Sequence, residues 1–215
     1  MLTQSDLVYY IIYIICLFYS FKAKSINIPG LNLLRILICY GFFTEMVVEL
    51  LQYFKTEENW PYYLYIPIEY VLICNFLKRN TRKKFLKNLI TISIYIYLIE
   101  NYLLTNFFHH FENYPSAIYN TSCFFITIWI VVIFFDLDLS DNLPITSVPI
   151  FWILCAFLIF YSGIFFFNGA YNYFLQNAST IAKNLRVYIN TVLNCILYLV
   201  LTYAFICSQN IKRFY

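Results

Sequence analysis

The chain has 215 residues and a net charge of +3, and 62% of its residues are hydrophobic, 22% aromatic and only 12% charged. A soluble domain carries about 25% charged residues, so too few polar side chains remain to cover a water-facing surface. The basic residues cluster beside apolar runs and form no extended basic face, which argues against nucleic-acid binding. The composition therefore predicts an integral membrane protein whose first partner is the lipid bilayer.

Long apolar runs divide the chain into seven predicted membrane spans. A bilayer core about 30 Å thick needs roughly 20 helical residues, and these runs are too long for barrel strands and lack their alternation. We expect an all-α, polytopic bundle of about seven transmembrane helices, forming a single domain over residues 1–215. The predicted spans are residues 6–21, 31–54, 61–77, 86–108, 117–135, 148–167 and 185–207. The first run follows no basic residue and no small-x-small cleavage site, so we expect a helix there and not a cleaved signal.

The orientation of the bundle follows from its basic residues. With the N-terminus outside, ten of them fall on the inner side and three on the outer side. The inner residues are Lys22, Lys24, Lys78, Arg79, Arg82, Lys83, Lys84, Lys87, Lys212 and Arg213. The outer residues are Lys55, Lys183 and Arg186. Because basic residues are retained on the cytoplasmic side during insertion, we expect the N-terminus outside and the C-terminus inside.

Aromatic residues gather near the predicted ends of the spans. They are Tyr9, Tyr10, Trp60, Tyr62, Tyr63, Tyr114 and Tyr119. Tyr and Trp are enriched where a membrane meets water, so we interpret these residues as an interfacial belt.

Charged residues inside the spans are the strongest functional signal, because each is costly when it faces lipid. Five of them lie away from the ends of their spans, namely Arg35, Glu45, Glu49, Glu69 and Glu100. A helical rise of about 1.5 Å per residue places the four carboxylates in one band between the midplane and the exterior. Arg35 lies nearer the inner side, and we expect it to face inward and bind a backbone carbonyl, a polar side chain or water.

Polar amides accompany these charges on the predicted helix faces. Asn101 follows Glu100 directly, and Asn190, Asn194 and Tyr198 recur every four residues on the last span, which places them on one face. The simplest arrangement turns all of these groups toward a polar cavity that opens outward. The expected ligand- or ion-binding residues are Glu45, Glu49, Glu69, Glu100, Asn101, Asn190, Asn194 and Arg35. The alternative is that they hydrogen-bond between helices and only stabilise the bundle.

Metal and cofactor sites find little support in the sequence. His109, His110 and Glu112 form a short cluster, but adjacent helical histidines point about 100° apart, and no third His exists. We predict no metal and no cofactor; the last span lacks the lysine that a retinal pigment needs. The seven cysteines lie in or at the ends of apolar runs, so we expect neither a disulfide framework nor a zinc site.

Two charged stretches lie on the predicted inner side. The KRNTRKKFLK run (78–87) is interpreted as a topology signal that also contacts anionic lipid. Asp136, Asp138 and Asp141 are interpreted as solvated charge at a helix end, with a docking surface for a basic partner as the alternative.

Three segments carry short motifs on which a family resemblance rests. Glu69 lies in the first segment, Tyr161 in the second, and Asn190 with Asn194 in the third. The segments are ENWPYYLYIPIEYVLICNF (58–76), PIFWILCAFLIFYSGIFFF (149–167) and NLRVYINTVLNCILYLVL (184–201). Together they resemble a loosely characterised group of small seven-helix integral membrane proteins of Bacteroidota. Members are often encoded near sensor kinases, so the resemblance implies signalling and a bacterial inner membrane.

These features predict a membrane sensor that binds a small ligand in an outward-facing, carboxylate-lined cavity and contacts a cytoplasmic or membrane signalling partner. A proton- or cation-coupled transporter that uses the same carboxylates is the alternative. A membrane-embedded enzyme ranks third, because no nucleophile–base pair stands out.

Overall fold

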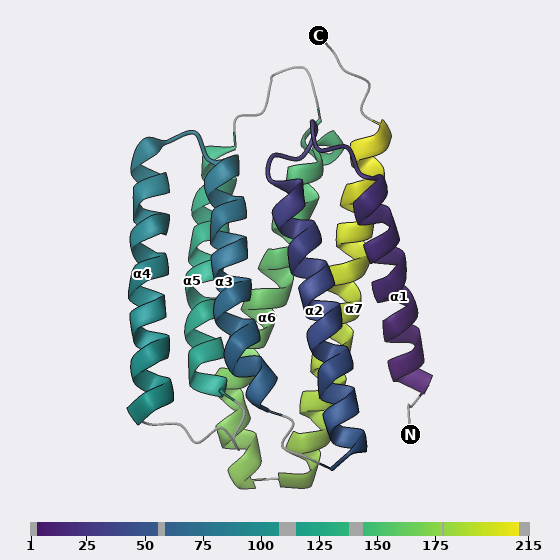
Figure 1. The fold of residues 1–215 in the computed structure, drawn as a ribbon, viewed down its shortest axis with the longest axis vertical. Helices are drawn as coiled ribbons and strands as arrows, with labels where there is room; N and C mark the ends of the chain where they lie inside the picture. The colour runs from purple at the N-terminus through teal and green to yellow at the C-terminus, as the bar shows by residue number, and fades with distance from the viewer. Residues whose placement is uncertain (1–3, 56–58, 108–114, 138–143, 178, 211–215) are drawn as a thin grey trace.

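The computed structural model describes residues 4–55, 59–107, 115–137, 144–177 and 179–210, which are drawn as ribbon in Figure 1. Within these ranges the chain forms seven α-helices, one short 3₁₀ helix and no strand, which confirms the all-α expectation. The elements are α1 (Gln4–Lys22), α2 (Leu31–Tyr53), α3 (Trp60–Asn80), α4 (Lys84–Phe107), α5 (Ser116–Asp136), η1 (Ile145–Ser147), α6 (Pro149–Asn177) and α7 (Ser179–Asn210).

Three helices extend well beyond the predicted spans. α3 continues to Asn80, and α6 and α7 reach 29 and 32 residues. Hydropathy marks where apolar residues stop, whereas a helix ends only where a breaker or tertiary contact stops it. Polar residues at the ends of α6 and α7 therefore continue these two helices past the predicted limits. Pro67 lies inside α3 without ending it.

The helices run alternately up and down (Figure 1), and the contacts between α1, α2, α3, α5, α6 and α7 close these helices into a ring. Around this ring α1 packs on α2, α2 on α3, α3 on α5, α5 on α6, α6 on α7, and α7 back on α1. α4 lies outside the ring against α3 and α5. Neighbours in space are thus not always neighbours in sequence, and this matters for the polar residues of α4.

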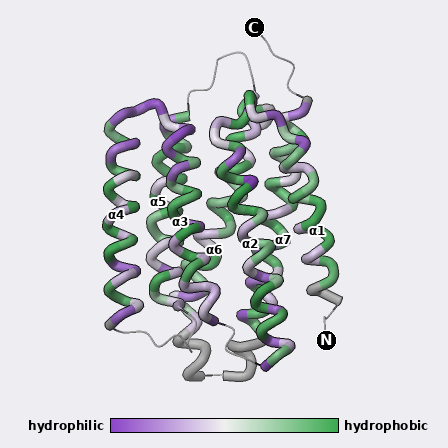
Figure 2. Tube along the Cα trace, in the orientation of Figure 1, coloured by the Kyte–Doolittle hydropathy of each residue, from purple (hydrophilic) through white to green (hydrophobic). Residues whose placement is uncertain are grey.

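Basic residues gather at one end of the bundle, where the α1–α2 connection (23–30) and the α3–α4 connection (81–83) lie (Figure 1). We name this the basic end. The described basic residues at this end are Lys22, Lys24, Lys78, Arg79, Arg82, Lys83, Lys84 and Lys87. The hydropathy colouring of Figure 2 shows hydrophilic segments at the helix ends there and mainly hydrophobic segments along the middle of the helices.

The interior near the basic end is filled by large aromatic side chains. Phe76 of α3, Phe157 of α6 and Phe205 of α7 are at most 1% exposed. The rings of Phe76 and Phe157 meet edge to face across the bundle, with centroids 6.3 Å apart. This geometry favours aromatic packing and closes the interior on this side.

Hydrogen bonds also join the connections at the basic end. The Lys24 ammonium donates to the carbonyl of Gln209 (2.9 Å), and the Asn27 amide donates to the carbonyl of Ser208 (2.6 Å). The Asn80 amide donates to the carbonyl of Pro29 (2.9 Å). The α1–α2 connection is therefore held by both α7 and α3.

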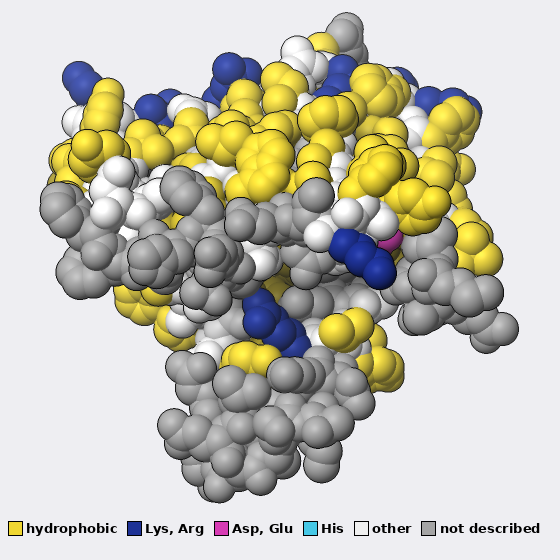
Figure 3. Space-filling view, turned by 60° about the horizontal axis from the view of Figure 1, so that its bottom comes forward, with side chains coloured by type: hydrophobic (Ala, Val, Ile, Leu, Met, Phe, Trp, Pro, Cys, Tyr) yellow, Lys and Arg dark blue, Asp and Glu magenta, His cyan; other side chains and the backbone are white. Residues whose placement is uncertain are grey.

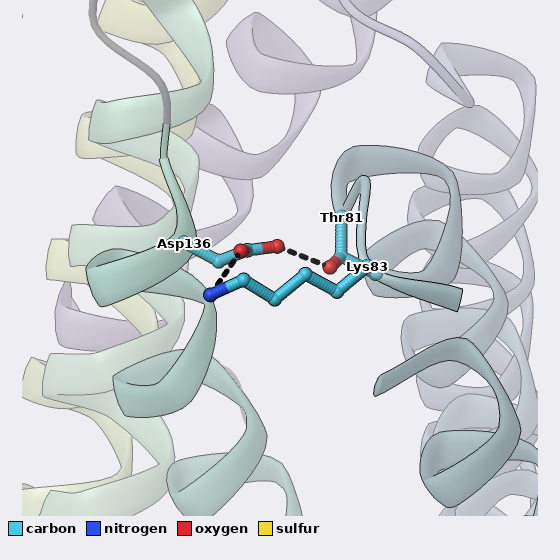
Figure 4. Close-up of polar contacts among 3 residues, drawn as sticks. All are labelled: Thr81, Lys83 and Asp136. Carbon is cyan, nitrogen blue, oxygen red and sulfur yellow. Dashed lines mark hydrogen bonds and ion pairs between the residues drawn. The ribbon is translucent and has the colours of Figure 1, made fainter. Parts of the chain in front are cut away.

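A polar contact between α5 and the α3–α4 connection adds to this set (Figure 4). The Thr81 hydroxyl donates to one oxygen of Asp136, and the Lys83 ammonium lies 3.0 Å from the other. The Asp136 side chain is 6% exposed, whereas that of Lys83 is 66% exposed. The Asp136 side chain is thus held by Thr81 and Lys83 and is more covered than the solvated charge that we expected. Asp138 and Asp141 lie outside the described residues.

Among the described residues, four helices are long and apolar enough to cross a membrane. They are α2, α5, residues 149–171 of α6 and residues 185–209 of α7. The apolar part of α1 is shorter, and α3 and α4 are less apolar along their length than α2. Large apolar side chains are nevertheless exposed on the outer faces of all seven described helices. On α4 they include Ile92, Ile96, Ile99 and Leu103, which share one face. These helices are compatible with lipid contact.

Candidate functional site

A polar cavity of about 420 Å³ opens between α2, α3, α6 and α7. Gln52, Asn59 and Arg186 lie around it near helix ends opposite the basic end, and we name this side the cavity end. Figure 3 looks toward the cavity end and shows a hollow between the helices, with Lys or Arg side chains beside it. The cavity is lined by Gly41, Thr44, Glu45, Val48, Gln52, Asn59, Tyr62, Tyr65, Ile66, Glu69, Tyr119, Phe160, Ile164, Arg186, Val187, Asn190, Asn194, Leu197 and Tyr198.

Glu69 is the deepest acidic group of the cavity, with 5% of its surface exposed. Its Oε1 accepts two hydrogen bonds, from the Tyr65 hydroxyl (3.1 Å) and from the Tyr161 hydroxyl (2.8 Å). Tyr65 lies one turn earlier on α3, and Tyr161 comes from α6. The two tyrosines therefore hold the carboxylate in one position between two helices.

Glu45 lies on α2, which packs beside α3. Its Oε1 accepts a hydrogen bond of 2.5 Å from the Tyr9 hydroxyl of α1. Its Oε2 is buried and finds no hydrogen-bond partner among the described residues. A buried polar atom without a partner is costly, so this oxygen is an acceptor that a ligand can satisfy.

Gly41 lies one turn before Glu45 and permits the close approach of two tyrosines. A Cβ at this position would lie 2.6 Å from the Tyr13 hydroxyl oxygen and 3.3 Å from that of Tyr65. The Tyr13 hydroxyl donates to the carbonyl of Ile38 (2.9 Å), and the Tyr13 ring stacks on Tyr198 with centroids 3.9 Å apart. The missing side chain of Gly41 thus shapes the tyrosine-lined wall.

α7 supplies a row of polar residues along the third wall. Arg186, Asn190 and Asn194 follow one another at four-residue spacing and all line the cavity. The Arg186 guanidinium lies over the Tyr171 ring, 5.2 Å from its centroid. Sequence reasoning selected the two asparagines but assigned Arg186 to an outer loop. Its spacing from Asn190 was the signal that could have placed it on the same face.

The structure does not bring the four predicted carboxylates into one cavity. Glu49 is exposed and accepts a hydrogen bond from the Tyr10 hydroxyl (3.3 Å). Glu100 accepts from the Thr121 hydroxyl (3.0 Å) at the contact between α4 and α5. Asn101 has a buried Oδ1 that finds no partner among the described residues. The reason is topological, because α4 packs outside the ring and its polar face meets α5.

Arg35 also lies away from the cavity, near the basic end. Its guanidinium donates to the carbonyls of Ser20 (3.0 Å), Phe21 (3.3 Å) and Ala23 (3.0 Å), and to the Asn32 side chain (3.1 Å). The expected backbone-carbonyl partners are confirmed. Arg35 therefore caps the C-terminal end of α1 and does not line the binding space.

Several tyrosines predicted to form an interfacial belt instead face the interior. Tyr9 bonds to Glu45, while Tyr62 and Tyr119 line the cavity. Tyr63 is buried. A sequence window near a span end cannot distinguish a tyrosine that faces headgroups from one that faces a cavity, because both positions need an apolar ring with a polar tip.

Within the described ranges no three His, Cys, Asp or Glu residues are placed to hold a metal ion. His109, His110 and Glu112 lie outside these ranges. All seven cysteines are free, and Cys16, Cys74 and Cys123 are buried.

Comparisons of the chain with protein-family models, curated proteins and solved structures return no match. The class of protein is therefore defined by the fold and the cavity themselves. The described part of the chain is an all-α bundle that has four helices long and apolar enough to cross a membrane and a polar cavity at one end.

Proposed function

We propose that this chain is a seven-span membrane sensor that binds a small ligand from the outside. The observation that carries the proposal is the cavity of about 420 Å³ with the buried Glu69 and the half-buried Glu45 on its walls. Small-molecule sites typically measure about 300–1,000 Å³ and combine an apolar lining with a few polar groups. The ligand-binding residues of the proposal are Glu45, Glu69, Asn190 and Asn194.

Seven spans with the N-terminus outside are supported by the placement of charge. Basic residues concentrate at one end, as expected for a cytoplasmic face. α3 is relatively polar in sequence, but Glu69 is turned inward and only 5% exposed. Polar groups that face the interior leave a more apolar outer surface than the composition of a helix indicates. With the basic end inside, the cavity end faces the exterior.

Binding is favoured over transport because the cavity is separated from the basic end by packed side chains. Phe76, Phe157 and Phe205 fill the interior between it and the basic end. A ligand that enters from outside is held there instead of passing through. A proton- or cation-coupled transporter remains the second candidate, supported by Glu69 at the closed end of the cavity. A membrane-embedded enzyme ranks third, because no His, the most frequent general base, is among the described lining residues.

A signalling partner on the basic end completes the proposal. The resemblance to seven-helix proteins of Bacteroidota supports this part and the placement in a bacterial inner membrane. The exposed basic residues of the α3–α4 connection would meet anionic lipid or a partner.

Cysteine accessibility tests the orientation and the opening of the cavity together. In a background with the seven native cysteines replaced, Asn190→Cys should react from outside intact cells with a membrane-impermeant maleimide. Lys84→Cys at the basic end and Ile96→Cys on the lipid-facing side of α4 are the controls, and both should stay unlabelled. Labelling of Lys84→Cys from outside, with Asn190→Cys left unlabelled, would show the opposite orientation and refute the proposal.

Transport is tested separately in sealed liposomes containing the purified protein. A sensor should bind its ligand without accumulating it inside. Uptake that depends on a pH gradient and is lost in Glu69→Gln would establish the transporter instead.

A further inference from the structure

The charge of the cavity points to the class of its ligand. Glu45 and Glu69 accept hydrogen bonds from tyrosine hydroxyls, and among the described residues no lysine or arginine bonds to either carboxylate. A buried carboxylate needs a compensating charge or a full set of donors. The Oε2 of Glu45 has no donor among those residues. A cation with N–H donors would meet both needs.

Aromatic rings surround the space beside these carboxylates. Tyr62, Tyr65, Tyr119, Tyr198 and Phe160 all line the cavity. The face of an aromatic ring attracts a cation within about 6 Å of its centroid, most strongly where water is excluded. Carboxylates combined with ring faces favour an ammonium group over a neutral or anionic group.

The remaining lining suits a hydrocarbon body. Val48, Ile66, Ile164 and Leu197 add apolar surface to the same cavity. A monovalent metal ion would leave most of this volume of about 420 Å³ unfilled. A divalent ion prefers at least six oxygen ligands, whereas Oε1 of each carboxylate is already engaged by tyrosine.

We infer that the cavity binds a small organic amine, with its ammonium group between Glu45 and Glu69 and its hydrocarbon part against the apolar and aromatic walls. This inference rests on the proposed function and narrows it to one ligand class. The amide oxygens of Asn190 and Asn194 provide further acceptors for the N–H donors. Arg186 lies one turn beyond Asn190 toward the helix end, so the positive charge sits at the mouth and the acidic groups lie deeper.

Thermal unfolding of the purified protein in nanodiscs provides the measurement. A thiol-reactive fluorophore reports unfolding, because Cys16, Cys74 and Cys123 are free and buried in the folded chain. Phenethylamine, 2-phenylethanol and phenylacetate serve as three ligands of similar shape and different charge. Phenethylamine should raise the unfolding temperature in a saturable way, and the alcohol and the acid should not.

Variants test whether phenethylamine stabilises the protein by binding to the carboxylates of the cavity. Glu45→Gln should increase the half-maximal phenethylamine concentration by about tenfold or more, as expected for losing one charge-assisted hydrogen bond. Glu45→Asp keeps the charge and should retain part of the response. Glu100→Gln is the matched control, because Glu100 also accepts a hydroxyl hydrogen bond inside the bundle but lies outside the cavity. Its response should equal that of the wild type.

Each other outcome overturns the inference in a recognisable way. An equal response of wild type and Glu45→Gln would show nonspecific partitioning of the amine into the bilayer. Stabilisation by the alcohol or the acid alone would refute the amine while leaving a ligand-binding cavity in place. Absence of any response would refute the amine, and if Asn190→Cys is also closed to outside reagent, the proposed function fails with it.

Discussion

The basic end and the cavity end of this bundle are built from the same helices but differ in what fills the space between them. Toward the basic end, phenylalanines of three helices meet, and hydrogen bonds join the connections to α3 and α7. Toward the cavity end, carboxylates, asparagines and tyrosines line a space of about 420 Å³. The basic end can therefore supply stability, while the cavity end keeps polar groups that can contact a ligand.

This division has a physical cause. Carboxylates buried away from water and without charged partners destabilise the structure that contains them. Close packing elsewhere must offset that cost, because a folded chain is only marginally stable. The difference between the two ends can be tested by substitutions that act on one end at a time.

The largest effect is expected from Arg35→Ala at the basic end. The substitution removes the donor to three backbone carbonyls and leaves those of Ser20 and Ala23 in buried positions. Loss of such charge-assisted bonds should cost about 3 kcal/mol and lower the apparent melting temperature. The melting temperature of Arg35→Lys should lie between those of the wild type and Arg35→Ala, since one ammonium cannot reproduce the planar set of donors of a guanidinium. Phenethylamine binding at temperatures where the variant is folded should not change; a selective loss of binding would contradict the division.

A smaller loss is expected from Gly41→Ala, which acts on the cavity wall. The new Cβ would meet the Tyr13 hydroxyl at 2.6 Å, and such overpacking costs about 1–3 kcal/mol. Gly169→Ala is the matched control, because nothing lies within 4 Å of the corresponding Cβ.

A double-mutant cycle sharpens the assignment to Tyr13. Tyr13→Phe removes the oxygen that the Cβ would meet, so Gly41→Ala should destabilise this background less than the wild type. Thermal unfolding of the four proteins provides the comparison, and additive effects would show that the Tyr13 contact is not the cause.

The smallest effects are expected at the contact between α5 and the α3–α4 connection. Thr81→Val removes a buried hydroxyl from Asp136 and should cost about 1 kcal/mol. Lys83→Ala removes a partner that is 66% exposed and should cost under about 0.5 kcal/mol. High salt should abolish the Lys83 effect and leave the Thr81 effect in place. A larger loss of stability from Lys83→Ala than from Thr81→Val would show that the ion pair contributes more than the hydrogen bond.

Residue patterns alone predicted the helices and several polar residues of the cavity. Glu45 and Glu69 were selected because charge inside an apolar run is costly, and Asn190 with Asn194 because of their four-residue spacing. Both arguments depend on one helix at a time. Arg35 was also placed correctly against backbone carbonyls, since a lone buried guanidinium must find acceptors nearby.

Apolar helices with basic residues on alternate connections could be predicted from the residue order, because length, hydropathy and charge act locally along the chain. Which polar groups share a space depends on how the helices pack. α4 lies outside the ring, so Glu100 of α4 meets Thr121 of α5. Glu69 of α3 instead meets Tyr161 of α6, a helix that follows much later in the sequence. Tyr9 meets Glu45 because α1 packs on α2. Helix periodicity predicts which face of a helix is polar, but the packing of helices that are distant in sequence determines which residues that face contacts.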